Sequence, residues 1–248
     1  MTAKDIDNNV INYEKSLEYW ADIPATVDGV LGGFGFISDA DIEGSTIFLN
    51  SLLSSKNPPC TNTAIDCGAG IGRITKFLLT QFFKSVDIVE PDSKFISTIK
   101  DFVGENKEKV GNLYNVGLQE FHPVKKYDVI WNQWVLGYLK DMDLISYLVR
   151  CSNALNENGI IVVKENVTSS GKPENDDNDS SVTRSLKQYL KIFKDANLKR
   201  IKQVKQTNFP NGIYPVYMFA LVPICNNSGL YNNVCNATEK YVSEINKL

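Results

Sequence analysis

The chain has 248 residues, of which 43% are hydrophobic and 22% are charged, so it is long enough to bury one sizeable core. Its formal net charge of −3 excludes the broad cationic surface that binds a phosphate backbone, and we expect no nucleic acid ligand. The first residues, Met1 to Asn12, are polar, and no stretch reaches the roughly 18 apolar residues of a membrane span. We therefore expect a soluble, intracellular protein with no membrane partner.

Five cysteines are scattered along the chain without a C-x-x-C spacing: Cys60, Cys67, Cys151, Cys225 and Cys235. Their odd number and irregular spacing argue against a disulfide framework and against structural zinc. We expect reduced thiols and no metal site.

The N-terminal region is predicted to contain two helices around a glycine-rich loop. The first helical pattern covers Tyr13 to Trp20. The four glycines within Thr26 to Gly35 predict an irregular loop whose backbone lies close to a ligand. A second helix is expected from Asp39 to Ser54, with Asp39 or Asp41 as its N-cap.

From Ala64 onward, short apolar runs alternate with helical patterns, which predicts a doubly wound α/β core: a mostly parallel sheet covered by helices on both faces. The expected strands are Thr63 to Cys67, Val86 to Glu90, Leu113 to Val116, Tyr127 to Trp131, Gly159 to Lys164, Lys199 to Lys205 and Tyr214 to Val222. The expected helices are Gly72 to Phe82, Ser93 to Val103, Met142 to Leu155 and Ser181 to Ala196.

Two polar segments are harder to interpret. The acidic stretch from Ser169 to Ser180 lies between an expected strand and an expected helix, and either disorder or a substrate-facing loop would explain it. The last segment, Cys225 to Leu248, is rich in Asn and is expected to end in a short helix.

The strongest local motif runs from Ile65 to Arg73, where a hydrophobic strand enters a G-x-G-x-G turn that opens a helix. Glycines such as Gly68 and Gly70 let the backbone approach a ligand at the carboxyl edge of the sheet. A dinucleotide-binding turn would have G-x-G-x-x-G spacing, and Asp66 would repel a pyrophosphate. An acidic site instead tolerates the sulfonium and amino groups of S-adenosylmethionine.

Glu90 strengthens this interpretation. It closes the expected second strand, where a carboxylate can accept both hydrogen bonds from a ribose diol. A glycine turn alone would be equally typical of an ordinary strand-to-helix connection, but the turn, Asp66 and Glu90 together favour a cofactor site. The segment Gly117 to Gln119 follows the third strand and could hold an adenine, although a plain turn explains it as well.

Long motifs occur in the same order as in one known family. They are Tyr19-Trp20-x-x-Ile23-Pro24-x-Thr26-Val27-Asp28-Gly29-x-Leu31-Gly32-Gly33, then Asp66 to Arg73, Asp128 to Val135, Asn158 to Val162 and Asp179 to Val182. With them, the chain resembles the eukaryotic α-N-terminal protein methyltransferases over nearly everything from Tyr13 to Leu221. The resemblance implies a class I S-adenosylmethionine-dependent methyltransferase fold, seven-stranded, with added N-terminal helices. We expect an N-terminal helical cap with the glycine-rich loop in residues 1–55, the methyltransferase core in residues 56–223, and a tail of unknown role in residues 224–248.

The resemblance also implies a function. The family transfers methyl groups to the α-amino nitrogen of proteins that begin, after loss of the initiator Met, with X-Pro-Lys or X-Pro-Arg, ribosomal proteins among them. We expect the protein in the cytoplasm, with the nucleus as a second compartment. By resemblance, the cofactor contacts are Gly68, Arg73, Glu90, Leu118, Gln119 and Gln133, with Trp20 nearby, in addition to Asp66 and Gly70 of the turn. The acceptor peptide would meet Leu31, Ile37, Trp134, Asn166, Asp176, Asp179, Ser181 and Tyr214.

These residue types suit methyl transfer, which needs a neutral amine lone pair aimed at the methyl group. Asp179 is the candidate base, and the carbonyl of Asn166 could accept a hydrogen bond from the amine. Trp20 and Trp134 offer π faces to the amine and the proline ring, although core packing would be the ordinary role of such residues. Asp176, with Asp179, would pair with the basic third residue of the substrate.

The remaining acidic residues of this stretch, Glu174 and Asp177, are expected to be solvated.

One position departs from the family pattern. Where the family carries a histidine thought to help deprotonate the amine, this chain has Tyr138, and its one histidine, His122, is expected to be an incidental surface residue. Tyrosine, with a pKa near 10, is a poor proton acceptor at neutral pH, so catalysis is expected to depend on Asp179. Two alternatives stay open: a class I methyltransferase with a different acceptor, small molecule or protein, and a non-catalytic cofactor-binding partner of another enzyme.

Overall fold

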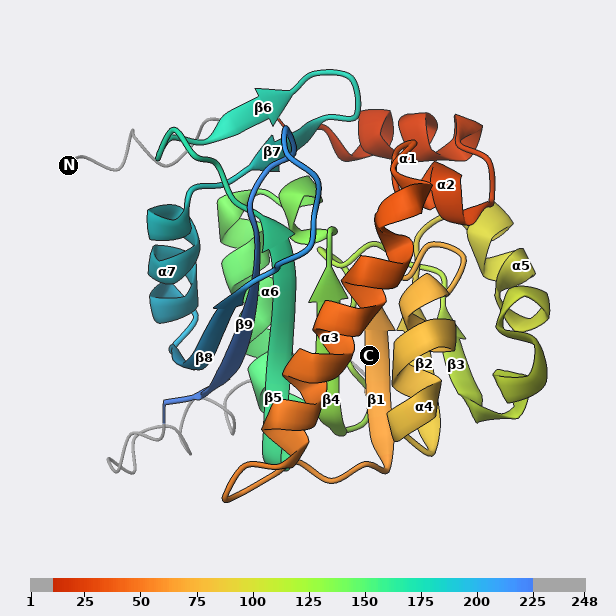
Figure 1. The fold of residues 1–248 in the computed structure, drawn as a ribbon, viewed down its shortest axis with the longest axis vertical. Coiled ribbons are helices and arrows are strands. Elements are labelled where there is room, and N and C mark those ends of the chain that lie inside the picture. Colours follow the sequence, from red (N-terminus) through yellow and green to blue (C-terminus); the bar gives the residue numbers. More distant parts are fainter. Residues whose placement is uncertain (1–10, 225–248) are drawn as a thin grey trace, which may run out of the picture.

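The computed structural model describes residues 11–224, built around one seven-stranded sheet (Figure 1). The strand order is β3-β2-β1-β4-β5-β9-β8, in which β9 is antiparallel to both of its neighbours and the other pairs are parallel. The strands are β1 Thr63–Cys67, β2 Ser85–Val89, β3 Val110–Tyr114, β4 Tyr127–Gln133, β5 Leu155–Asn166, β8 Leu198–Lys205 and β9 Val216–Pro223. The prediction of a seven-stranded, mostly parallel sheet is confirmed.

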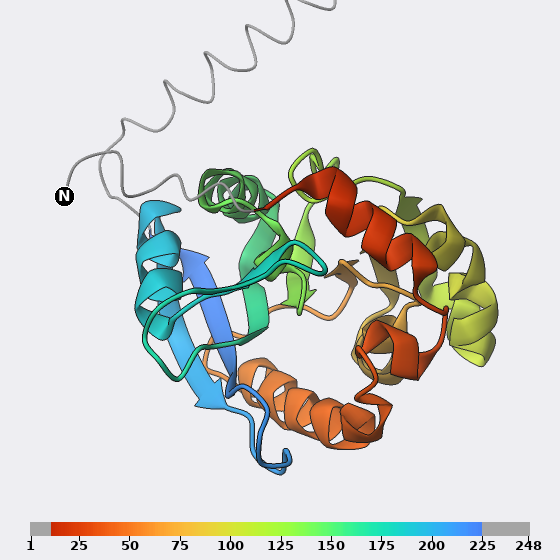
Figure 2. The same ribbon diagram turned by 90° about the horizontal axis from the view of Figure 1, so that it is seen from above.

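Helices cover both faces of the sheet, with α3 and α6 on opposite sides of it (Figure 2). The helices are α1 Tyr13–Asp22, α2 Val27–Val30, α3 Ser38–Leu53, α4 Thr80–Phe82, α5 Ser93–Val103, α6 Asp141–Asn153 and α7 Leu186–Asp195. Side chains alternate along β4, so that Ile130 packs in the core under α6 and α7, whereas Trp131 packs in the core under α3. Both faces of the central strands are buried, which explains the apolar runs in β5 and β9, whereas the edge strands β3 and β8 are more exposed and more polar.

Helix α1 lies across the carboxyl edge of the parallel strands (Figure 1). Asn12 caps its N-terminus by accepting hydrogen bonds from two backbone amides. The Ser16 hydroxyl donates to the carbonyl of Asp179 at 2.9 Å, and the Lys94 ammonium donates to the carbonyls of Trp20 and Ala21 at the other end of the helix. These contacts hold α1 over the edge from both sides.

The acidic stretch is ordered, so the disordered alternative for Ser169 to Ser180 is wrong. Strand β6, Glu174–Asp176, pairs antiparallel with β7, Ser181–Thr183. Consequently the helix expected from Ser181 begins only at Leu186. The reason is tertiary: the fully buried Arg184 donates to the carbonyls of Leu136 and Leu139 and holds the chain extended beside them.

Three further local predictions are corrected by the structure. The glycine-rich loop contains the short helix α2, because the Thr26 hydroxyl caps it by accepting from the Gly29 amide. Helix α3 begins at Ser38, before both proposed caps, and Asp41 lies buried inside it. The helix expected from Gly72 contains a π-helical turn, Thr75–Leu79, before α4.

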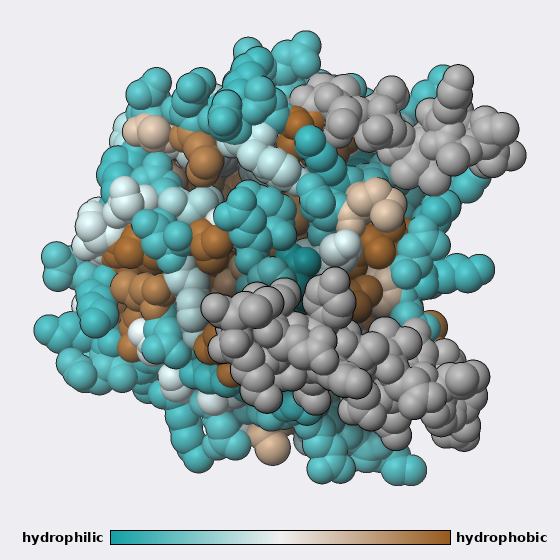
Figure 3. Space-filling view, turned by 180° about the vertical axis from the view of Figure 1, so that it is seen from behind, coloured by the Kyte–Doolittle hydropathy of each residue, from teal (hydrophilic) through white to brown (hydrophobic). Residues whose placement is uncertain are grey.

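On the face opposite that of Figure 1, hydrophobic residues appear as separate patches among hydrophilic ones (Figure 3). Within residues 11–224, no helix combines the length and apolar character needed to span a bilayer. Cys60 is exposed and Cys67 and Cys151 are buried as free thiols. The predicted short helix between Cys225 and Leu248 lies outside the described residues.

Candidate active site

Two adjoining cavities open at the carboxyl edge of the sheet. The glycine-turn cavity, about 900 Å³, is bounded by Asp66 to Arg73 and Glu90, and the hairpin cavity, about 790 Å³, is bounded by β6, β7 and residues preceding β9. The two share a wall that includes Trp20, Leu31, Trp134 and Tyr138. Every predicted cofactor residue lines the first cavity: Trp20, Asp66, Gly68, Gly70, Arg73, Glu90, Leu118, Gln119 and Gln133.

The turn after β1 requires glycine for two reasons. Gly68 and Gly70 have φ angles of +70° and +56°, in the left-handed region that other residues rarely adopt. A Cβ on Gly68 would also lie 2.2 Å from the Val135 side chain. The bare backbone of this turn therefore faces the cavity directly.

Two buried carboxylates stand beside the turn. Glu90 accepts hydrogen bonds from the amides of Gly70, at 2.8 Å, and Asp92, at 2.9 Å, and burial raises its pKa to about 7. Asp66 accepts from the amide and the hydroxyl of Thr75, and burial raises its pKa to about 6. Each carboxyl group is thus oriented by backbone donors before any ligand binds.

Arg150 is a contributor that the sequence analysis missed. From α6 its guanidinium donates to the carbonyls of Leu118, Gln119 and Phe121 at 2.8–3.0 Å, which orders the loop after β3 along the cavity. Nothing in the sequence separates this arginine from a solvated helix residue.

Trp134 adopts a left-handed conformation, with φ +53°, which is uncommon for a bulky residue. The buried Glu165 carboxylate holds the turn by accepting from the amides of Val135 and Leu136 at 2.9 and 2.8 Å. Burial raises the pKa of Glu165 to about 7, and this residue too was missed. The indole N–H of Trp134 is buried without a hydrogen-bond partner, so a donor stands available in the wall between the cavities.

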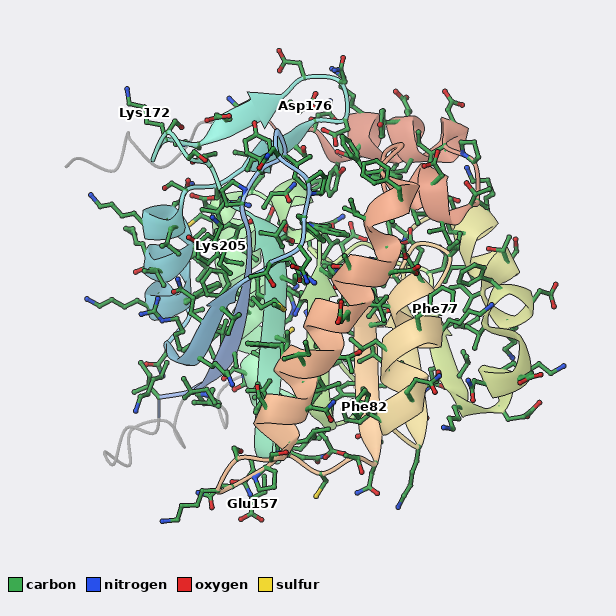
Figure 4. All side chains as sticks on the ribbon, in the orientation of Figure 1. Phe77, Phe82, Glu157, Lys172, Asp176 and Lys205 are labelled. Carbon is green, nitrogen blue, oxygen red and sulfur yellow. The ribbon has the colours of Figure 1, made fainter. Side chains whose placement is uncertain are left out.

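The hairpin cavity collects the residues predicted to meet the acceptor: Leu31, Ile37, Trp134, Asn166, Asp176, Asp179, Ser181 and Tyr214. Tyr138 lines it too. Asp176, the last residue of β6, lies beside α1 (Figure 4). Glu174, expected to be a solvated loop residue, also lines the cavity and accepts a hydrogen bond of 2.6 Å from the Tyr214 hydroxyl. Hydrogen bonds from Ser170 and Tyr214 lower the pKa of Glu174, which favours its ionised form.

Tyr138 and Asp179 are joined directly. The Tyr138 hydroxyl donates to Oδ2 of Asp179 at 2.6 Å, and Oδ1 accepts from the Ser181 amide at 3.0 Å. Burial and the Asp179 carboxylate raise the pKa of Tyr138 well above its usual value, so the phenol keeps its proton. His122 is exposed and lines neither cavity.

Comparison with known proteins agrees with this geometry. The family model described as AdoMet dependent proline di-methyltransferase matches residues 8–222. The chain is 46% identical over 215 residues to the alpha N-terminal protein methyltransferase 1 of Drosophila melanogaster, covering 86% of this chain and 76% of the relative. It is 45% identical over 223 residues to the N-terminal Xaa-Pro-Lys N-methyltransferase 1 of Homo sapiens, covering 89% of this chain and all of the relative. The chain belongs to the AdoMet-dependent proline di-methyltransferase family.

Solved structures support the same assignment. A SAM-dependent methyltransferase from Leishmania major superposes with a TM-score of 0.80 at 36% identity, covering 88% of each chain. The glycopeptide N-methyltransferase MtfA in complex with SAM superposes with a TM-score of 0.59 at 10% identity, covering 73% of this chain and 87% of that one, a likeness of fold alone. This family member is therefore an S-adenosylmethionine-dependent methyltransferase.

The glycine-turn cavity of this methyltransferase fits the cofactor. Gly68 and Gly70 bring the backbone of the turn to the cavity wall, and Glu90 is oriented to accept hydrogen bonds from a ribose diol. The Arg73 guanidinium, 4% exposed, offers a cation for the amino-acid carboxylate, and Leu118 offers an apolar surface for the adenine.

The Glu90 assignment predicts how cofactor affinity depends on pH. Because the pKa of Glu90 is about 7, its carboxyl gains a proton as the pH falls from 8 to 6 and loses acceptor capacity. S-adenosylhomocysteine affinity, measured by calorimetry, should therefore fall over this range and be constant above it. Glu90→Gln should bind about tenfold more weakly at pH 8 and lose the pH dependence near 7, leaving only the contribution of Asp66 near 6.

The matched control is Glu157→Gln, an exposed carboxylate at the opposite end of the molecule (Figure 4). It should leave both the affinity and its pH dependence as in the native protein. An unaltered pH dependence in Glu90→Gln would refute the assignment.

Proposed function

We propose that this methyltransferase acts on the α-amino group of proteins whose processed N-terminus reads X-Pro-Lys or X-Pro-Arg. The carrying observation is that the hairpin cavity meets the glycine-turn cavity at Trp20, Trp134 and Tyr138, with the carboxylates of Asp176 and Asp179 lining the acceptor side. The curated human relative is named for Xaa-Pro-Lys N-termini, which is the substrate this arrangement would suit.

The choice of cellular substrates and compartment is a further part of the proposal. On the resemblance to the family alone, we include ribosomal proteins among the substrates. On the same basis, we place the enzyme in the cytoplasm with the nucleus as a second compartment.

Bound S-adenosylmethionine supplies an electrophilic methyl group, and this chain must present a neutral amine to it. An α-amino group has a pKa of about 7.7 to 8.0, so its proton is lost at small cost near neutral pH. Asp179 would take that proton, since its carboxylate lines the hairpin cavity and is held by Ser181 and by Tyr138, which lines both cavities. Asn166, at the end of β5, lines the same cavity and would aim the amine with its carbonyl oxygen.

The two tryptophans would hold the first residues of the acceptor. The Trp20 ring lies 5.9 Å from that of Tyr138, and Trp134 lines both cavities. Their faces would contact the cationic amine and the proline ring, each cation contact being worth about 0.5 to 2 kcal/mol. Asp176 would then meet the basic third residue.

A peptide assay tests the proposal. Peptides that begin Ser-Pro-Lys or Ala-Pro-Lys should gain methyl groups on the α-amine when incubated with the protein and S-adenosylmethionine, as read by mass spectrometry. An N-acetylated peptide and a Ser-Pro-Glu peptide are the controls and should stay unmodified. Cofactor binding without transfer to the Ser-Pro-Lys or Ala-Pro-Lys peptide would instead favour a non-catalytic partner or a different acceptor.

Asp179→Asn should lower kcat by at least about 100-fold, because a carboxamide cannot accept the proton. Cofactor affinity should be unchanged, since Asp179 lines only the hairpin cavity. Asp177→Asn is the matched control: it removes an exposed carboxylate from the same hairpin, outside both cavities, and should keep native turnover. Full turnover in Asp179→Asn would show that another group accepts the proton.

Tyr138→His should raise the rate below neutral pH. Tyr138 keeps its proton, whereas a histidine with a pKa of about 6.5 can accept one from the amine. The measurement is the pH profile of kcat/KM for the Ala-Pro-Lys peptide. A profile identical to that of the native enzyme would count against any base role at this position.

A further inference from the structure

Asp41 is a buried carboxylate that lines neither cavity. It lies inside α3 with no solvent exposure and carries two cations at once, Arg73 at 2.8 Å and Lys164 at 2.5 Å. Both of its oxygens also accept from the Gln133 amide nitrogen at 2.9 Å. Four segments distant in sequence therefore meet at this one side chain.

The Lys164 ammonium by itself balances the negative charge of Asp41. This ammonium, fully buried, donates also to the Asp41 carbonyl, to the Ser45 hydroxyl and to the Gln206 side-chain oxygen. Arg73 is a second, nearly buried cation on the same carboxylate, so Asp41, Lys164 and Arg73 together carry two positive charges and one negative charge. Arg73 lines the glycine-turn cavity, and Lys164 does not.

Arg73 and Gln133 are the partners of Asp41 that line the glycine-turn cavity. One guanidinium nitrogen is held by Asp41, with the Ser38 hydroxyl at 3.4 Å, and the group lies 5.5 Å from the centroid of the Trp134 ring. A guanidinium has five N–H donors in a rigid plane, so fixing one nitrogen and one face sets the direction of the rest. Gln133 is fixed in the same way, because its amide nitrogen is on Asp41 and its oxygen accepts from the Trp131 indole at 3.1 Å.

We propose that Asp41 is a positioning residue that sets Arg73 and Gln133 to receive the amino-acid end of the cofactor. A planar carboxylate is recognised best by a guanidinium already turned to meet it. The ribose and adenine ends of the ligand would lie at Glu90 and Leu118, which Asp41 does not contact. The inference rests on cofactor use, not on the identity of the acceptor.

The binding of two cofactor fragments distinguishes a positioning role of Asp41 from a purely structural role. S-adenosylhomocysteine carries the amino-acid carboxylate, and 5′-methylthioadenosine lacks it while keeping the adenine and ribose. Asp41→Asn should weaken S-adenosylhomocysteine binding about tenfold and leave 5′-methylthioadenosine binding nearly as in the native protein, as measured by calorimetry. Because no peptide is present, failure of this test is distinct from failure of the proposed acceptor.

A second variant keeps the test decisive if Asp41→Asn fails to fold. The double variant Asp41→Asn with Lys164→Met removes one charge of each sign, so the fully buried Lys164 ammonium is not left without its partner. Arg73, which lines the glycine-turn cavity, then loses Asp41 while the charge on Lys164 is gone. It should show the same selective loss for S-adenosylhomocysteine. Ser45→Ala is the matched control, because it touches Lys164 without touching Arg73 and should keep the native ratio of the two affinities.

Three results would overturn the proposal. They are native affinities for both fragments in the folded variants, an equal loss for both fragments, and loss of the fold in both variants. The last two would assign Asp41 to the stability of the fold alone.

Discussion

The site depends on the turn at the end of β4, which holds Trp134 in a left-handed conformation between the two cavities. A strained backbone persists only where its surroundings determine it. Here the Glu165 carboxylate binds the next two amides from β5, and the Arg184 guanidinium binds the carbonyl of Leu136 from the chain that leaves the hairpin. The wall between the glycine-turn cavity and the hairpin cavity is thereby held in place by β5 and by the chain that follows the hairpin.

Three buried carboxyl groups lie beside the glycine turn and the turn after β4. Asp66, Glu90 and Glu165 all have raised pKa values because of burial, and each is oriented by two backbone or side-chain donors. Such groups have lost their hydration before the ligand arrives, so little reorganisation remains when the ligand binds. Asp66 and Glu90 thus preorganise the glycine-turn cavity, whereas the hairpin cavity is lined by the buried Glu165 and by more exposed carboxylates on a two-stranded hairpin.

Tyr138 occupies the position where the motif resemblance leads us to expect a histidine. The phenol remains protonated and donates to Asp179, so it orients a proton acceptor instead of being one. Helix α1 completes the arrangement, since Ser16 binds the Asp179 carbonyl and Trp20 packs on the Tyr138 ring. The cover over the cofactor and the proposed base are therefore mechanically connected.

The sequence by itself determined the core strands, the glycine turn and the Glu90 position, because these follow from local rules: apolar runs, left-handed glycines and a carboxylate at a strand end. The motif resemblance, also in the sequence, named the residues expected to meet the acceptor, and the structure brings them to one cavity. The contacts of Asp41, Arg150, Glu165 and Arg184, and the strand at Ser181, emerge only in the folded structure. Each of these depends on hydrogen bonds or ion pairs between residues far apart in the chain, and no local pattern reports which buried carbonyl or charge a side chain will meet once the sheet has formed.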